Sequence, residues 1–401
     1  MPRYSFIDLF AGCGGLTEGF YKKGYIPLAH VEWDHTACET LKERMKYYKF
    51  KNAEDSVLEA DITDDNIVNR IDSIVNGAQV DVIIGGPPCQ AYSSLGRAKD
   101  ENAMEEDPRN FLFESYVKIL NHYMPKVFVF ENVTGILTAH VKGKKIIDLV
   151  IKELSRNYNV DFDPDMVVLN SADYGVPQIR KRVIIIGVRN DIQQITPREI
   201  YNAIKKTHYD PLEELPHKKG MKKYITVRQA IGELPAVEPG EGKKNIDFIS
   251  NRDNSFLRRI VKRNYTGLMD HVARKHNDID REIYRTMAAR LLTYQELLEL
   301  RPDLKPENPR VFGNSYTVQF WDRPSRTIIA HLYKDGNQFI HPDYMQARTL
   351  TVREAARLQS FPDDFVFCGS RTDQFKQIGN AVPPLLSEAI AKAIKTKLNE
   401  L

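Results

Sequence analysis

The sequence contains few cysteines and lacks the groupings that would give them a structural role. Four occur in 401 residues, at Cys13, Cys38, Cys89 and Cys368. They are widely spaced, with no CxxC pair and no metal-ligand grouping, so we expect neither a disulfide framework nor a metal site. This cysteine usage favours a reducing compartment.

Long apolar runs and a strong excess of one charge are also missing. No stretch is long enough to span a bilayer, and the first residues enter a strand-like pattern without the layout of a signal peptide. Hydrophobic residues make up 42% of the chain and charged residues 28%, and the formal net charge is +3. We therefore expect a cytoplasmic globular protein that contacts no membrane, with a charge that permits nucleic-acid binding without requiring it.

Changes in local pattern divide the chain into regions. Residues 1–189 alternate short β-branched runs with amphipathic stretches, which predicts an α/β domain with a mostly parallel sheet covered on both faces. From about 190 to 345 lysine pairs, prolines and glycines interrupt the pattern, as in a second domain with extended surface loops. Helical spacing returns over 346–372 and again over 373–401.

A glycine-rich turn follows the first predicted strand, in FIDLFAGCGG at 6–15. Glycines at the carboxyl end of a sheet strand let the backbone approach a ligand closely, although a tight structural turn is an equally good explanation of the turn alone. Glu32 ends the next strand, where an acid can bind ribose hydroxyls, and Trp33 can cover an adenine ring. Asp61 ends a third strand and can accept from an exocyclic amine.

Together these residues indicate a nucleoside-containing cofactor, while each acid alone would more often be a solvated helix cap. The turn lacks the GxxxxGK[ST] pattern that binds polyphosphates. A nicotinamide cofactor and S-adenosylmethionine therefore remain as the candidates.

The stretch GGPPCQAYSS at 85–94 presents a cysteine at the same edge of the sheet. Pro87 and Pro88 stiffen the approach to Cys89, which suits a positioned nucleophile. A buried, inert cysteine is the alternative, but such cysteines favour apolar elements over a polar loop.

Two further groups of polar residues lie on predicted strands, one at the end of a strand and one on an entering strand. Glu131 comes after four apolar residues, so partial burial would favour its protonated form, unless it only caps the next helix. Gln178, Arg180 and Arg182 alternate along an entering strand and would share one face, where they could hold a base oxygen or phosphates, or line a sheet edge.

In this combination and order the sequence resembles the cytosine-5 DNA methyltransferases across nearly its whole length. The Pro-Pro-Cys-Gln motif at 87–90 and the Glu-Asn-Val motif at 131–133 carry most of the resemblance. The other matching motifs are FIDLFAGCGG at 6–15, VEWD at 31–34, QIRKR at 178–182, RTLTVREAARLQSFPDDF at 348–365 and IGNAVPP at 378–384.

The resemblance implies a Rossmann-like, S-adenosylmethionine-dependent methyltransferase fold with a smaller, irregular second domain. Residues 1–189 would form the catalytic and cofactor-binding domain, and 190–345 the target-recognition domain. Residues 346–372 would form a hinge and framework segment, and 373–401 would return to the catalytic domain. Within the hinge, Arg357 could touch DNA or hold the scaffold together, and helix packing favours the scaffold.

The resemblance also implies a covalent mechanism on a flipped-out cytosine. Cys89 would add to carbon 6, Glu131 would bind ring nitrogen 3 and the exocyclic amine, and Arg182 with Arg180 would support the base oxygen. The residues matched to further base or DNA contacts are Gln90, Ser93, Asn132 and Gln178. The residues matched to the cofactor S-adenosylmethionine are Phe10, Ala11, Gly12, Gly14, Leu16, Glu32, Trp33, Asp61, Ile62, Pro88, Asn380, Ala381 and Val382.

By this resemblance the chain is expected to methylate carbon 5 of a cytosine in a specific double-stranded DNA sequence. It would do so as a monomer without a metal, in a bacterial or archaeal cytosol in association with the nucleoid. It would serve as the methylase of a restriction–modification system or as an orphan relative, with any cognate restriction endonuclease a functional and not a physical partner.

Three other functions fit the sequence less well. A transfer RNA cytosine methyltransferase would share the catalytic motifs but not the large variable region. A catalytically idle DNA-binding module would not need to retain Cys89, Glu131 and Arg182. A nicotinamide-dependent dehydrogenase would leave the Pro-Pro-Cys-Gln motif unexplained.

Overall fold

The computed structural model describes residues 3–88, 112–141, 143–213, 219–305 and 315–401. Three predicted site residues, Cys89, Gln90 and Ser93, lie outside these described residues. The chain forms two compact units. The first comprises Met1–Tyr174, Lys181–Lys206 and Val382–Leu401, and the second comprises Gly175–Arg180 and Thr207–Ala381. Over the described residues, no helix combines the length and the apolar character needed to cross a membrane.

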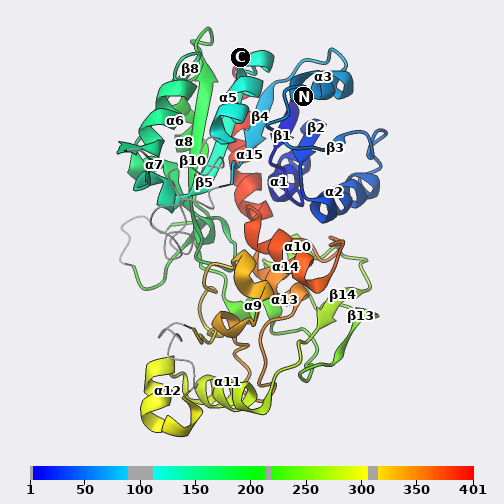
Figure 1. The fold of residues 1–401 in the computed structure, drawn as a ribbon, viewed down its shortest axis with the longest axis vertical. Coiled ribbons are helices and arrows are strands. Elements are labelled where there is room, and N and C mark those ends of the chain that lie inside the picture. Colours follow the sequence, from blue (N-terminus) through cyan, green and yellow to red (C-terminus); the bar gives the residue numbers. More distant parts are fainter. Residues whose placement is uncertain (1–2, 89–111, 142, 214–218, 306–314) are drawn as a thin grey trace. The chain divides into compact units, whose positions relative to one another are not determined.

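An eight-stranded sheet forms the centre of the first unit (Figure 1). Its strands are β1 (Ser5–Leu9), β2 (Ile26–Glu32), β3 (Val57–Glu59), β4 (Val82–Gly85), β5 (Val127–Val133), β8 (Tyr158–Val160), β9 (Val168–Asn170) and β10 (Lys181–Arg189). They follow the order β3-β2-β1-β4-β5-β10-β8, and β9 also pairs with β10. The strands from β3 to β5 are parallel, and β10 is antiparallel to its neighbours, which confirms the predicted α/β fold.

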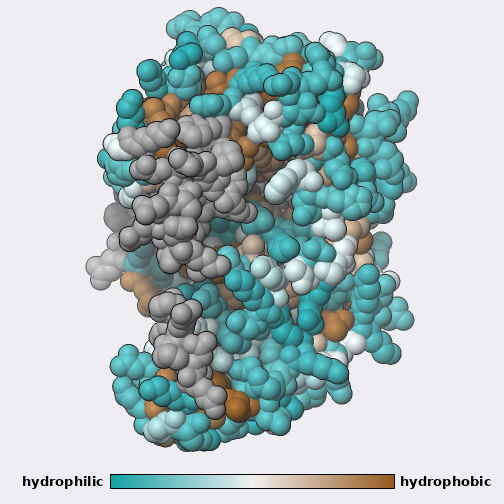
Figure 2. All heavy atoms as spheres, viewed as in Figure 1, coloured by the Kyte–Doolittle hydropathy of each residue, from teal (hydrophilic) through white to brown (hydrophobic). Residues whose placement is uncertain are grey.

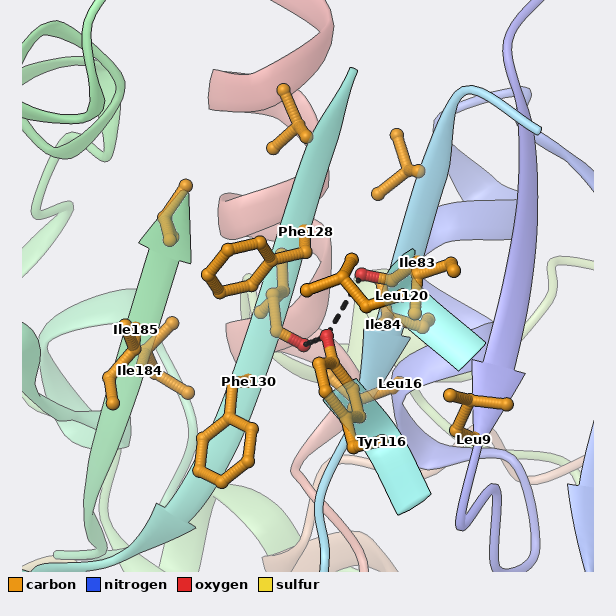
Figure 3. Packing of buried hydrophobic residues seen from close by; sticks show 14 of the residues in the cluster. Leu9, Leu16, Ile83, Ile84, Tyr116, Leu120, Phe128, Phe130, Ile184 and Ile185 are labelled. Carbon is orange, nitrogen blue, oxygen red and sulfur yellow. Dashed lines mark hydrogen bonds between the residues drawn. The ribbon is translucent and has the colours of Figure 1, made fainter. Parts of the chain in front are cut away.

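The central strands are apolar because both faces of the sheet are covered. All five residues of β1 are buried, as are the four of β4. On one face, Tyr116 packs edge-on against Phe130, and its hydroxyl donates to the backbone oxygens of Ile83 and Val129 (Figure 3). This contact ties a helix to β4, which precedes the predicted nucleophile Cys89, and to β5, which carries Glu131.

Eight helices of the first unit are described: α1 (Gly15–Lys22), α2 (His35–Tyr47), α3 (Ile67–Val75), α5 (Leu112–Tyr123), α6 (Ile146–Leu154), α7 (Pro164–Val167), α8 (Pro197–Ala203) and α15 (Pro384–Leu398). Helix α15 packs against both α1 and α8, and α5 packs with α6. In Figure 1, α5 passes in front of the sheet and α15 behind it.

Helix α15 is an integral part of the first unit although it comes from the far end of the sequence. The Ser387 hydroxyl donates to the backbone oxygen of Leu16 at 2.6 Å. Gly19 faces the same helix, where a Cβ atom would lie 2.4 Å from the backbone nitrogen of Glu388. The missing side chain of Gly19 therefore allows α1 and α15 to approach closely.

The second unit is more irregular. Its described elements include two small sheets, one of β11 (His208–Tyr209) and β12 (Lys222–Lys223), the other of β13 (Gly242–Ile246) and β14 (Leu268–Val272). Its helices include α9 (Val227–Ile231), α10 (Leu257–Ile260), α11 (Asp278–Arg290), α12 (Tyr294–Leu300), α13 (Val352–Leu358) and α14 (Arg371–Asn380). Helices α11 and α12 share an apolar cluster that includes Tyr284 and Leu297.

Helix α13 and the segment directly before it carry three arginines whose side chains are fully buried. Arg348, just before the helix, pairs with Glu354 through two hydrogen bonds of 2.8 Å. Arg357 pairs with Asp363 in the same two-pronged way and also contacts Glu233 at 3.0 Å. These contacts support the scaffold role of Arg357 over a DNA contact.

The third of these buried arginines, Arg353, donates to the backbone oxygens of Met269, Pro362 and Phe365.

The two compact units differ in their limits from the functional regions expected at 1–189, 190–345, 346–372 and 373–401. The first unit continues to Lys206, and the second reaches Ala381. The functional roles of those regions remain predictions.

Most side chains on the face drawn in Figure 2 are hydrophilic, with hydrophobic residues in small groups. Large exposed hydrophobic side chains are therefore informative where they occur. Trp33 is the clearest case in the first unit, because it is 75% exposed.

Candidate active site

The glycine-rich turn leads from β1 into α1 with three residues in the left-handed region. Phe10, Gly12 and Gly14 have φ angles of 57°, 54° and 91°. At Gly14 a Cβ atom would lie 2.6 Å from Leu41 of α2, so both conformation and space require glycine there. The backbone nitrogen of Ala11 donates to Val31, which joins the turn to β2.

Glu32 organises the junction between this turn and the next one. Its carboxylate accepts from the backbone N–H groups of Gly12, Trp33 and Asp34 at 2.8, 3.0 and 2.9 Å. Burial raises the pKa of Glu32 above its ordinary value, and the three N–H groups oppose this rise. The carboxylate is thus held rigidly between the two turns, with Trp33 beside it and open to solvent.

The other predicted cofactor residues divide between the units. Leu16, Ile62 and Val382 are buried in the first unit, where Pro88 is half-buried and Asp61 is exposed. The Asp61 carboxylate accepts from the backbone and hydroxyl of Thr63. Asn380 and Ala381 end α14 in the second unit.

Asp8 lies in β1 beneath the turn, and sequence reasoning missed it. It is fully buried and accepts from the Thr17 hydroxyl at 2.6 Å. Burial raises the pKa of Asp8 to about 7, against the effect of Thr17. Among the described residues its Oδ1 atom has no hydrogen-bond partner. A lone acid within the apolar strand FIDLF was the available signal.

The segment before Cys89 is fitted closely to its neighbours. A Cβ atom at Gly85 would lie 2.5 Å from the backbone oxygen of Leu9, and one at Gly86 would lie 2.5 Å from Oε2 of Glu131. The Asn132 side chain, which is buried, donates to the backbone oxygen of Pro87 at 3.2 Å. The two glycines are therefore required by contacts with β1 and β5, and Asn132 holds the proline segment.

Glu131 and Arg182 meet across the antiparallel pair β5 and β10. The Nε atom of Arg182 lies 3.0 Å from Oε1 of Glu131, and both side chains are largely buried. Glu131 thus touches Arg182 and Gly86 with its two carboxylate oxygens. The structure brings together these two predicted catalytic residues at the base of the segment that leads to Cys89.

Gln178 and Arg180 lie differently from the sequence expectation. Strand β10 begins at Lys181, so neither residue shares a strand face with Arg182. Gln178 is fully buried; its amide donates to the backbone of Leu358 and to Gln359 and accepts from Ile328.

Arg180, 1% exposed, donates to three backbone oxygens of the second unit, those of Ile328, Gly379 and Ala381. Two of these acceptors lie in or directly after α14. Within the second unit, Gln178 and Arg180 therefore join the segment before β10 to residues that lie 148 or more positions later in the sequence.

A model of the C-5 cytosine-specific DNA methylase family matches residues 4–396. The chain belongs to this family. Its enzyme class is accordingly DNA cytosine-5 methyltransferase, and S-adenosylmethionine is the methyl donor that the family implies.

Individual relatives agree with the family assignment over nearly the whole chain. The type II methyltransferase M.Bpa9945I of Bacillus paralicheniformis is 35% identical over 462 residues, covering 98% of this chain and 99% of the relative. The type II methyltransferase M.DdeI of Desulfomicrobium norvegicum is also 35% identical, over 97% of this chain and 88% of the relative. A crystal structure of a DNA modification methyltransferase from an E. coli prophage matches with a TM-score of 0.71 and 25% identity, covering 99% of each chain.

The residues of the first unit suit the adenosine part of the methylase cofactor. A fixed carboxylate at Glu32 can accept from ribose hydroxyls, and the exposed ring of Trp33 offers an apolar face to a base. Gly12 and Gly14 leave the turn without side chains that would block a ligand. No group of three or more potential metal ligands occurs among the described residues.

Proposed function

We propose that this methylase transfers a methyl group to carbon 5 of a cytosine in a specific duplex DNA sequence, with Cys89 as nucleophile. The observation that supports this best is the pairing of Glu131 with Arg182 next to Gly86, three residues before Cys89. A carboxylate and a guanidinium that are largely buried together at the base of a cysteine loop form a polar site able to bind a base edge.

Carbon 5 of cytosine is a poor nucleophile, so the ring must first be activated. The Cys89 thiolate forms a bond to carbon 6, and carbon 5 becomes enamine-like. After carbon 5 has accepted the methyl group it loses its proton, the bond from sulfur to carbon 6 breaks, and the Cys89 thiolate is released. Glu131 binds ring nitrogen 3 and the exocyclic amine as charge develops on the ring.

Arg182 orients Glu131 and supports the base oxygen. Its Nε atom already contacts one carboxylate oxygen, and its Nη1 atom donates to the backbone of Lys181 at 2.8 Å. Arg180 and Gln178 contribute indirectly in this proposal, because their side chains are committed to buried partners in the second unit. Asn132 likewise acts by holding the carbonyl of Pro87.

S-adenosylmethionine supplies the methyl group when it is bound. The residues that would hold its adenosine are Glu32, Trp33, Asp61 and Ile62, with the turn from Phe10 to Leu16 beneath it and Pro88 near its methionine end. Asn380, Ala381 and Val382 would complete the site.

Because the target base lies within a duplex, it must be flipped out before Cys89 can reach it, which costs a few kcal/mol of unstacking. Residues 190–345 would recognise the target sequence and contribute contacts that offset this cost. The type II names of the relatives support a role as the methylase of a restriction–modification system, or as an orphan relative of one.

Bisulfite sequencing of DNA from cells that express the protein tests reaction, substrate and sequence context together. We expect one cytosine to be protected within a fixed motif, and Cys89→Ser to abolish this protection. If the Cys89→Ser variant retained full methyl transfer from labelled cofactor, the assignment of Cys89 as nucleophile would be wrong. If the protein methylated transfer RNA and not duplex DNA, the assignment of duplex DNA as substrate would be wrong.

A further inference from the structure

A short 3-10 helix in the second unit, η5 (Ala330–Tyr333), packs closely along α14. A Cβ atom on Gly379 would lie 2.2 Å from the backbone nitrogen of Ala330, so the two backbones are in contact. Further along, the Lys376 ammonium lies 5.2 Å from the centre of the Tyr333 ring. The two elements therefore present one continuous surface.

Three exposed cations lie on this surface. Arg371 begins α14, Lys376 lies on the same helix, and Lys334 directly follows η5. None of the three forms a salt bridge with another of the residues that the structure describes. We call Lys334, Arg371 and Lys376 the α14 cation surface.

The nearby carboxylates are engaged in local structure. Asp373 accepts from the hydroxyl and backbone of Ser370 in the box that caps α14. Asp335 accepts from the backbone of Asn337. Asp335 and Asp373, two carboxylates near the α14 cation surface, thus already serve as turn and cap acceptors.

A buried arginine adds positive charge behind this surface. Arg274 donates to the backbone oxygens of Leu332 and Lys334 and packs against the ring of Phe375. Burial, and then the charge of Arg371, lower the pKa of Arg274 from its ordinary value. The two guanidinium groups are therefore close enough to repel each other, which leaves the surface suited to a polyanion.

Aromatic side chains complete the surface. The rings of His331 and Tyr333 stack with their centres 6.3 Å apart, and Tyr333 also lies under Lys376. Unpaired cations with interleaved aromatic residues are a common arrangement for binding the sugar-phosphate backbone of nucleic acids.

We propose that the α14 cation surface contacts the phosphates of the duplex DNA substrate, independently of base sequence. This inference rests on the proposed function, because it takes the duplex as substrate. It assigns a DNA-contact role to Lys334, Arg371 and Lys376, none of which is among the residues proposed for the cofactor site or the chemistry at Cys89.

The test compares two triple variants that remove the same charge. The first, Lys334→Gln with Arg371→Gln and Lys376→Gln, removes the α14 cation surface. The control changes three exposed lysines on helices of the first unit that likewise form no salt bridge among the described residues, Lys118, Lys152 and Lys392, each to Gln. Equilibrium binding to a fixed duplex is measured over a range of salt concentrations.

Each lost phosphate contact should reduce the slope of log K against log salt concentration by about 0.9. We expect the surface variant to lose about 2 to 3 units of slope and the control to keep the wild-type slope. If the two variants had equal slopes, whether both kept the wild-type slope or both lost about 2 to 3 units, the proposal would be overturned. Polyglutamate and unlabelled duplex DNA are also compared as competitors for the bound duplex. If polyglutamate released the wild-type protein from the duplex as effectively as unlabelled DNA does, the proposal would be overturned, since the surface would then lack preference for a nucleic-acid backbone.

A charge-retaining variant, Lys334→Arg with Arg371→Lys and Lys376→Arg, guards against misfolding and should keep the wild-type slope. Loss of slope in this variant would count against phosphate binding. Methyl transfer to DNA at low salt is measured in parallel. Wild-type protein that binds duplex without methylating it would contradict the proposed function while leaving the α14 cation surface supported.

Discussion

At the scale of single residues, Gly86 offers the sharpest test of the candidate site. A methyl group at this position would lie 2.5 Å from the Glu131 carboxylate. We expect Gly86→Ala to displace that carboxylate and to lower the rate of methyl transfer on the order of 100-fold, as small misplacements in active sites do. The thermal midpoint should change little, because the atom that must move is the end of the flexible Glu131 side chain.

The matched control is Gly267→Ala. Gly267 has no positive φ, and its nearest neighbour, the Tyr265 hydroxyl, would lie 3.6 Å from the new Cβ. This variant should retain wild-type activity. A Gly86→Ala enzyme as active as the Gly267→Ala enzyme would show that the Glu131 position does not govern the reaction.

Asn132 supports a second residue-level prediction. Its side chain donates to Pro87 and accepts from the backbone of Val133. Because Asn132→Ala leaves a buried carbonyl without its donor, it should lower the free energy of unfolding by about 1–3 kcal/mol. Urea denaturation measures this loss. Methyl transfer should fall as well, since the Pro87 segment loses its anchor; the exposed Asn69→Ala variant is the control and should change neither quantity.

At the scale of elements, α1 and α2 are joined by a buried ion pair. Arg44 donates to both carboxylate oxygens of Glu18, at 2.9 and 2.8 Å, and the Tyr48 hydroxyl donates to the same carboxylate. Arg44→Met would leave the buried Glu18 carboxylate with Lys22, at 3.3 Å, as its remaining counter-charge, which should cost up to about 3–5 kcal/mol of stability. Denaturant unfolding should show that the double variant, Glu18→Gln with Arg44→Met, recovers most of the lost free energy of unfolding. A double variant no more stable than Arg44→Met alone would refute this account.

The same pair should make stability depend on pH. Burial alone would raise the pKa of Glu18, but Arg44 outweighs it and holds the pKa below its ordinary value. A carboxyl with a lowered pKa contributes its full stability above the unfolded-state pKa, about 4.3, and loses it as pH falls further. We therefore expect the wild type to lose stability below that pH more steeply than the double variant does, in denaturant unfolding at a series of pH values.

At the scale of the whole molecule, each compact unit contains one tryptophan. Trp33 lies in the first unit and Trp321 in the second. Fluorescence of the Trp321→Phe variant therefore follows the first unit, and amide hydrogen exchange of the wild-type protein follows the second, because Trp33→Phe would remove a proposed cofactor contact. Because most proposed cofactor contacts lie in the first unit, S-adenosylmethionine at 100 times its Kd should stabilise that unit by about 2.7 kcal/mol. Equal shifts of both transitions would contradict this expectation.

Alternation of strands and helices was enough to predict the α/β fold, because apolar runs such as those of β4 and β5 are typical of strands buried on both faces. The place of Glu32 at the end of a strand could be predicted in the same way, and its role in the cofactor site stays a prediction. The bond from Asn132 to Pro87 could not be predicted, since their separation of 45 positions leaves no local pattern.

Arg180 shows the same limit at longer range. Its acceptors lie 148 to 201 positions away, in a segment that returns from the other end of the second unit. Alternation around QIRKR predicts a shared strand face, but the strand begins only at Lys181. Such partners depend on the tertiary path of the chain, which local periodicity does not contain.

The contact between α1 and α15 also has a consequence during synthesis. Ser387, which bonds to Leu16, is translated 371 residues after it. At typical elongation rates of 5–20 residues per second, α1 waits roughly 20 to 70 s on the ribosome before its covering helix emerges. Unlike domains that fold from a contiguous N-terminal segment, the first unit is completed only after the second has been made. A nascent chain therefore cannot assemble this unit until nearly all of its sequence has left the ribosome.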